Sequence, residues 1–252
     1  MRERYRLGMG TSPEFGPTVI AVDWSGARRP KGIWLAVVRG GELVESRAVA
    51  SREAAVADVV NAAPPFIAGF DFSFGVPEWF AREQGCTTIE QVWDAAEREG
   101  ERWLAPTAPF WRARCNVVAE QRFRRCEGHY PTAKSVFQLV GNGQVGAGSV
   151  RGMPLLKRLR EAGIAIWPFD APGERTAFEI YPSALRRLVP DAGPFTNNDE
   201  RDAVCSALVM WRYRETVATL GAATDPTIRL EGDIWAPTPP PELITAWPSA
   251  TR

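Results

Sequence analysis

The sequence FIAGFD at residues 66–71 is an almost unbroken apolar run that ends in an acidic residue. A second run, VIAVD at residues 19–23, has the same form. Continuous apolar runs of this length are typical of strands that are buried on both faces of a sheet. We therefore predict two central strands of an α/β sheet. Each strand delivers an aspartate at its end, Asp23 from the first and Asp71 from the second.

The remaining periodic segments predict a mixed order of strands and helices around these two. The turn at Arg39-Gly40-Gly41 joins two alternating segments and is typical of a β-hairpin. Ser51 is a typical helix N-cap, and the helix after it ends before Pro64. Further helices are predicted at 88–104, 154–162 and 199–220, further strands at 164–167 and 175–180, and a terminal hairpin at 228–235.

The length of 252 residues suits one α/β domain. We place it at residues 18–237, with a helical insertion at about 78–163 after the fourth strand. Residues 1–17 are polar, bear arginine and have no apolar signal region, so we expect a disordered arm or an expression remnant. Residues 238–252 form a proline-rich tail.

Composition argues against several classes of protein. The 30 acidic and 30 basic residues cancel, which disfavours a strongly basic nucleic-acid coat but leaves room for a local basic groove. The four cysteines form no CxxC pair and His129 is the only histidine, which argues against structural zinc, a disulfide framework and histidine-based hydrolases. No apolar run approaches a membrane span, so we expect a cytoplasmic protein with no membrane partner.

The glycine-rich segment at residues 141–148 formally contains GxGxxG. Only a short strand could precede it, and no acidic residue follows at the spacing that a dinucleotide site requires. We interpret the segment as a flexible loop or the start of a helix over the cleft. The sequence has no P-loop motif.

Acidic side chains recur where predicted strands end or helices begin. An isolated carboxylate beside a buried strand loses hydration without compensation, and a divalent cation can supply the missing charge. Two such ions, about 3.5–4 Å apart, can hold the attacking and leaving oxygens of a phosphodiester. We predict catalytic roles for Asp23, Asp71, Glu179 and Asp202, and Mg²⁺ or Mn²⁺ ligands at Asp23, Asp71, Glu179, Asp199 and Asp202. For Asp199 alone, a helix-start role is the alternative.

A basic stretch with interleaved aromatic residues covers residues 111–134. Arginine beside aromatic residues suits contact with phosphates and stacking on bases, and a solvated helix face is the alternative. The predicted nucleic-acid-binding residues are Arg112, Arg114, Arg122, Arg124, Arg125 and Lys134.

Four segments together resemble, in the same order, the motifs of a domain-of-unknown-function family of predicted RNase H-like nucleases. They are VIAVDWSG at 19–26, GFDFSFGVP at 69–77, EIYPS at 179–183 and NDERDA at 198–203, and LEGDI at 230–234 matches a terminal strand pair. The resemblance spans about residues 18–237. It implies an RNase H-like mixed sheet flanked by helices, with a metal-dependent acidic centre at Asp23, Asp71, Glu179 and Asp202. Asn198 stands where many relatives have histidine.

From these observations we predict a metal-dependent nuclease, a hydrolase that cleaves phosphodiesters of DNA or RNA by in-line attack of water at a carboxylate-held Mg²⁺ or Mn²⁺ centre. A non-catalytic nucleic-acid-binding module on the same fold is one alternative. An ATPase-like or kinase-like phosphoryl-transfer protein is another, although such proteins usually need two domains of this type.

Overall fold

The computed structural model describes residues 16–29, 31–105, 109–111, 118, 121–130, 132–140, 144–189 and 193–237. Most of the predicted N-terminal arm and all of the proline-rich tail lie outside these residues.

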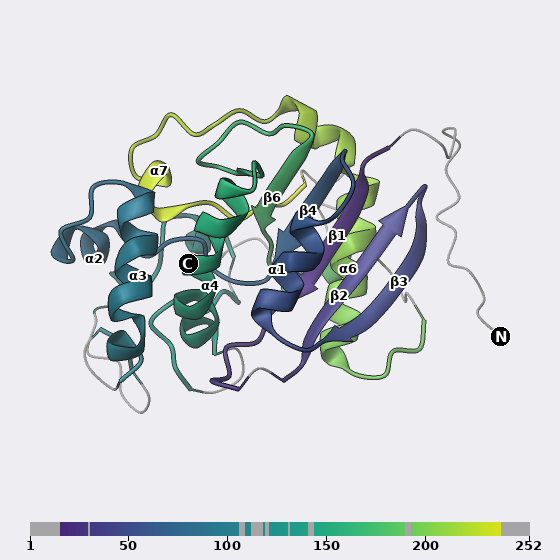
Figure 1. Ribbon diagram of the computed structural model, residues 1–252. Coiled ribbons are helices and arrows are strands. Elements are labelled where there is room, and N and C mark those ends of the chain that lie inside the picture. The colour runs from purple at the N-terminus through teal and green to yellow at the C-terminus, as the bar shows by residue number, and fades with distance from the viewer. Residues whose placement is uncertain are drawn as a thin grey trace.

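The described residues form one six-stranded sheet in the order β3-β2-β1-β4-β6-β5. The strands β1, β2 and β3 are antiparallel neighbours, whereas β4 is parallel to both β1 and β6, and β5 is parallel to β6. This mixed sheet, flanked by helices, confirms the predicted α/β class (Figure 1). The strands are β1 Thr18–Asp23, β2 Ile33–Arg39, β3 Glu42–Val49, β4 Phe66–Phe70, β5 Ala165–Ile166 and β6 Arg175–Glu179.

The predicted hairpin and the helix after it are both present. Gly40 and Gly41 have φ angles of 56° and 82°, which glycine adopts without the steric cost of a Cβ. Helix α1, Arg52–Val60, begins after Ser51, whose hydroxyl accepts a hydrogen bond from the amide of Ala54 at 3.1 Å. Local turn and cap chemistry therefore sets this part of the fold.

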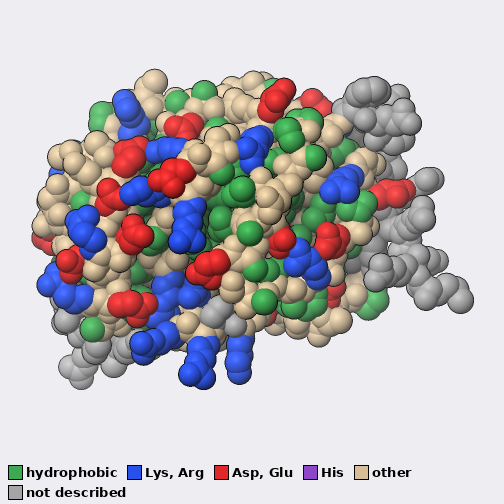
Figure 2. All heavy atoms as spheres, in the orientation of Figure 1, with side chains coloured by type: hydrophobic (Ala, Val, Ile, Leu, Met, Phe, Trp, Pro, Cys, Tyr) green, Lys and Arg blue, Asp and Glu red, His purple; other side chains and the backbone are tan. Residues whose placement is uncertain are grey.

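Two hydrophobic clusters lie on opposite faces of the sheet. One contains Val22 and Phe70 and packs under helices α1, α3 and α4. The other contains Val19 and Phe178 and packs under α6, which crosses β1 and β2 (Figure 1). On the surface, acidic and basic side chains are interleaved on the visible face (Figure 2), in line with the zero net charge.

Between β4 and β5 the chain forms the predicted helical insertion. Its described elements are α2 Glu78–Glu83, α3 Ile89–Trp103, the 3-10 helix η2 Cys126–His129 and α4 Val145–Glu161. Thr88 caps α3 within a capping box, as the sequence predicts for a helix start. Helix α4 begins earlier than expected, so part of the glycine-rich segment is helical.

The C-terminal part differs from the sequence prediction in two places. The predicted helix at 199–220 is α6 Asn198–Arg212 followed by the 3-10 helix η4 Arg214–Thr219. The predicted terminal hairpin is wrong, because Ile228–Glu231 is the short helix α7. Among the described residues 232–237, Ile234 forms an isolated parallel bridge with Glu179 of β6. The short α5 Pro182–Leu185 and η3 Arg186–Leu188 connect β6 to α6.

Within the described part of the chain, none of the helices has the length and apolar character needed to cross a membrane.

Candidate acidic site

The register of the sheet brings Asp23 and Asp71 to the same end of the sheet, where β1 and β4 both terminate. Val22 of β1 pairs with Phe70 of β4, and the amide of Asp71 donates a hydrogen bond to the carbonyl of Val22 at 3.1 Å. The two aspartates therefore follow neighbouring residues of two parallel strands. The structure therefore places the two aspartates side by side at the carboxyl ends of β1 and β4.

The alternation of side chains shows which face of the sheet each aspartate occupies. Val22 and Trp24 both belong to the cluster under α1, α3 and α4, and so do Phe70 and Phe72. Because successive side chains of a strand point to opposite faces, Asp23 and the adjacent Asp71 are assigned to the face covered by α6.

The start of α6 supplies two more acidic residues to this face. The side chain of Asn197 accepts a hydrogen bond from the amide of Glu200 at 2.8 Å and so fixes the beginning of the helix. Asp199 and Asp202 lie in its first turns, on one side of the helix. Gly32 makes room for Asp199, since a Cβ at Gly32 would lie 2.4 Å from Oδ2 of Asp199.

The four aspartates act on one another electrostatically. Burial, followed by the charges of Asp71, Asp199 and Asp202, raises the pKa of Asp23 to about 10. Burial, with Asp202 and then Glu179, raises the pKa of Asp71 to about 8. Burial and Asp202 also raise the pKa of Asp199. These shifts identify an acidic cluster of Asp23, Asp71, Asp199 and Asp202.

Only one member of the acidic cluster has a basic partner in the described part of the chain. Asp202 Oδ1 accepts a hydrogen bond from Nη1 of Arg186 at 3.2 Å and lies 3.8 Å from Nε of Arg201. No described residue forms a hydrogen bond or an ion pair with the carboxylate of Asp23, Asp71 or Asp199. The cluster therefore holds more carboxyl groups than it has basic partners among the described residues.

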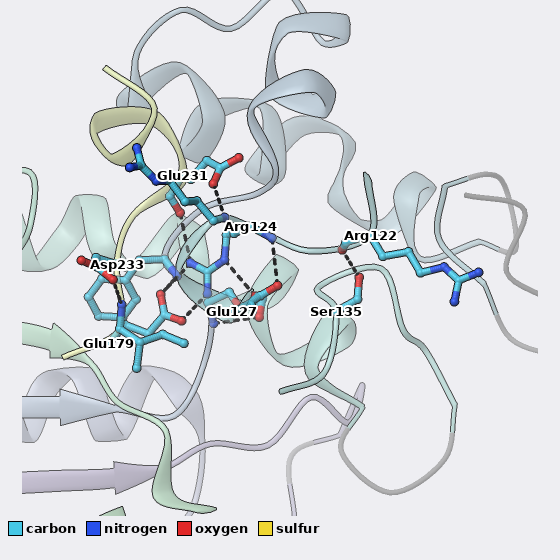
Figure 3. Close-up of polar contacts among 12 residues, drawn as sticks. Arg122, Arg124, Glu127, Ser135, Glu179, Glu231 and Asp233 are labelled. Carbon is cyan, nitrogen blue, oxygen red and sulfur yellow. Dashed lines mark hydrogen bonds and ion pairs between the residues drawn. The ribbon is translucent and has the colours of Figure 1, made fainter. Parts of the chain in front are cut away.

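Glu179 belongs to a different group of charges. Its neighbours Phe178 and Ile180 lie in the cluster under α6, so Glu179 points to the opposite face of the sheet. There the guanidinium of Arg124 donates to both of its carboxylate oxygens, and the amide of Phe74 donates to Oε2 at 2.8 Å (Figure 3). The prediction that Glu179 joins the other ligands needs correction, because Glu179 is the counterion of Arg124, although its charge still acts on Asp71.

Arg124 is buried, with 1% of its surface exposed. Besides Glu179, it donates to Glu127 at 2.9 Å and to the backbone carbonyl of Glu231 at 3.0 Å. Burial disfavours its charge, but nearby negative groups, Glu179 and Glu127 among them, raise the pKa of Arg124 above its ordinary value. We call Arg124, Glu127 and Glu179 the Arg124 network.

This burial overturns the prediction that Arg124 contacts nucleic acid. Arg125 has an exposed side chain, which pairs with Asp225 at 2.6 Å. The carbonyl of Arg122 accepts a hydrogen bond from Ser135, and its side chain points away from Arg124 (Figure 3). Lys134 is exposed. The predicted residues Arg112 and Arg114 lie outside the described residues.

The carboxylate donor set of the acidic cluster is of the kind that hard divalent cations bind. As the side chains stand, no group of three or more described His, Cys, Asp or Glu residues is arranged to hold a metal ion. Mutual repulsion of carboxylates is a physical reason for such an arrangement when no cation is present.

Sequence reasoning missed two residues of the site. Arg186, the partner of Asp202, is one of many arginines and carries no local signal. Gly32 has a φ of 73° and directly precedes β2, and a glycine before an apolar run is a weak sign of a close approach.

No protein-family model matches this chain, and no curated protein or solved structure is significantly similar to it.

Proposed function

We propose that this protein is a metal-dependent nuclease with an RNase H-like fold. The observation that carries the proposal is the acidic cluster: four aspartates from two adjacent strand ends and one helix start, three of them without a basic partner among the described residues. Such an arrangement is costly for the fold unless a ligand uses it. The mixed sheet, with its central parallel strands, is compatible with an RNase H-like topology.

The four aspartates would hold Mg²⁺ or Mn²⁺ through their carboxylate oxygens. A bound divalent cation supplies charge neutralisation for the phosphodiester and makes a water molecule more acidic. Asp23 and Asp71, fixed on the sheet, would orient the substrate phosphate through that centre, while Asp199 and Asp202 would close it from α6. Arg186 lies beside Asp202 and offers a cation for the phosphate charge.

A non-catalytic nucleic-acid-binding module is the second candidate. The observation that favours it is that the described carboxylates are not already arranged around one metal position. If this second function is correct, the protein should bind nucleic acid in EDTA and should not cleave it in Mg²⁺ or Mn²⁺.

Cleavage assays test the proposal directly. The wild-type protein is incubated with single-stranded, duplex and hybrid oligonucleotides in Mg²⁺, Mn²⁺ or EDTA. We expect cleavage only with a divalent cation, and loss of at least about 100-fold in rate for Asp71→Asn, the scale of losing one electrostatic stabiliser. Asp94→Asn is the matched control, because Asp94 pairs with Lys157 on the surface. Activity that survives EDTA would exclude the proposed chemistry.

A further inference from the structure

The loop between β1 and β2 directly follows Asp23 and carries a concentration of positive charge. Its described residues include Arg28, Arg29 and Lys31, all exposed, and it contains no acidic residue. In the described part of the chain, none of these three side chains forms a hydrogen bond or an ion pair. A group of Lys and Arg side chains projects from the lower margin of Figure 2, in the region where Figure 1 draws this loop.

Three backbone contacts hold the loop in place. The side chain of Arg52 donates to the carbonyls of Ser25 and Ala27 at 2.8 and 2.9 Å. Arg151 of α4 donates to the carbonyl of Gly26 at 2.5 Å. The loop is thus anchored by charged side chains from helices α1 and α4.

Gly26 is also packed closely against α4. A Cβ at this position would lie 2.5 Å from the amide nitrogen of Gly148, so only glycine allows the approach. Trp24 adds a hydrogen bond from its indole nitrogen to the carbonyl of Gly148 at 3.2 Å. These contacts hold the loop, which directly follows Asp23 of the acidic cluster, against α4.

A cavity of about 440 Å³ opens beside this loop. Arg28 and Arg151 line it, and Glu101 is its one acidic residue. Both oxygens of Glu101 accept hydrogen bonds from Arg151, at 2.7 and 3.0 Å. The cavity lining therefore has one more positive than negative side chain, that of Arg28. Other lining residues are Gly26, Leu104, Gln144 and Ala147.

A neighbouring cavity of about 260 Å³ shares Arg28, Arg151 and Glu101. It adds Arg52 but also Glu53 and Glu97, so its charges balance. Burial, and then the nearby charge of Arg151, lower the pKa of Arg52. An anion in the larger cavity would lie beside Arg28 and Arg151, which both line it.

We propose that the β1–β2 loop and the larger cavity bind the phosphate backbone of one nucleic-acid strand on its way to the acidic cluster. The choice of ligand rests on the proposed function. Arg28, Arg29 and Lys31 would contact phosphates, while Arg52 and Arg151 position the loop. The proposal assigns a nucleic-acid contact to a loop outside the predicted stretch 111–134, and the cations of this loop have no described partner.

Binding measured in EDTA tests this inference separately from cleavage. A fluorescently labelled single-stranded oligonucleotide is titrated with wild type and with the triple variant Arg28→Ser/Arg29→Ser/Lys31→Ser, at several salt concentrations. We expect the variant to bind about tenfold more weakly or worse, and the slope of log K against log salt to shrink by about 2 units, because each lost contact with a single strand removes about 0.7.

A second triple variant, Arg39→Ser/Arg212→Ser/Arg229→Ser, removes the same charge from exposed positions elsewhere. It should keep both the affinity and the salt slope of wild type. Equal losses in the two variants, an unchanged loop variant, or a wild type that binds no oligonucleotide would each overturn the inference. A wild type that binds through the loop but cleaves nothing would refute the nuclease and leave the loop assignment standing.

Discussion

Two groups of buried or half-buried carboxylates lie near the carboxyl edge of the same sheet, on its opposite faces. In the Arg124 network, Glu179 and Glu127 share a buried guanidinium. In the acidic cluster, Asp23, Asp71 and Asp199 have no described basic partner. In the first group both carboxylates bond to a cation of the chain, whereas in the second only Asp202 does among the described residues. The difference separates a structural site from a candidate binding site more clearly than the residue types do.

The largest effect is expected from a variant that removes the cation of the Arg124 network. Arg124→Met leaves Glu179 and Glu127 buried without their cation, and removal of one partner of a buried pair costs about 3–5 kcal/mol in the free energy of unfolding. The matched control is Arg125→Met, whose side chain is 61% exposed and pairs with Asp225 at the surface. Such surface pairs contribute less than about 1 kcal/mol.

Urea unfolding in EDTA measures both free energies. If the two variants lose the same stability, the Arg124 network is not the structural element that its burial indicates.

How far the sequence predicts these two groups depends on how far apart the interacting residues lie along the chain. The runs that end at Asp23 and Asp71 carry their strand signal locally, and a parallel sheet then aligns their ends. The pairing of Arg124 with Glu179 joins residues that are 55 positions apart, and nothing in the composition of residues 111–134 marks one arginine as buried. The sequence-based prediction therefore placed the two residues in separate sites, whereas the structure pairs them.

The face that Glu179 occupies follows from the alternation of side chains along β6, and a shift of one residue in the strand register would place it on the other face. That alternation follows from the core positions of Phe178 and Ile180 and could have been read from the sequence with the strand bounds in hand.

The terminal segment shows the same lesson at short range. Residues 228–235 alternate in a way that favours a strand, but Asp225 accepts hydrogen bonds from the amides of Thr227 and Ile228 and starts a helix instead. The sequence Asp225-Pro226-Thr227 is a helix-start signal that outweighs the alternation.

The second prediction concerns pH and sharpens the description of the acidic cluster. The pKa of Asp23 and Asp71 is raised in the folded protein to about 10 and about 8, so the fold binds protons that the unfolded chain has already released above about pH 4. Stability of the metal-free protein should therefore fall as pH rises from about 5 to 8, by less than about 1.4 kcal/mol per pH unit for each group.

Thermal melts in EDTA across this range measure the slope. The double variant Asp23→Asn/Asp71→Asn should show a flatter profile than wild type, because it removes both titrating groups. A wild-type profile as flat as that of the double variant would mean that the two aspartates are ionised without cost.

The smallest expected effect is the most discriminating. Replacing a carboxylate with an amide should change the free energy of unfolding in opposite directions in the two groups. Glu179→Gln weakens charge-assisted hydrogen bonds from Arg124 and should lower the free energy of unfolding by about 1.5–3 kcal/mol. Asp23→Asn removes a carboxyl group that must keep its proton in the metal-free fold, so it should raise that free energy on the order of 1 kcal/mol, with a larger gain at pH 8 than at pH 5.5.

Titration with Mn²⁺ completes the comparison. A cation that binds only the folded state stabilises it by about 2.7 kcal/mol at a concentration 100 times its Kd. Wild type and Glu179→Gln should both gain this stability, since Glu179 already serves Arg124, and Asp23→Asn should not. If Asp23→Asn melts lower than wild type without metal yet still gains stability from Mn²⁺, then Asp23 is a structural residue. The cation would then bind elsewhere, and the contrast between the Arg124 network and the acidic cluster would fail.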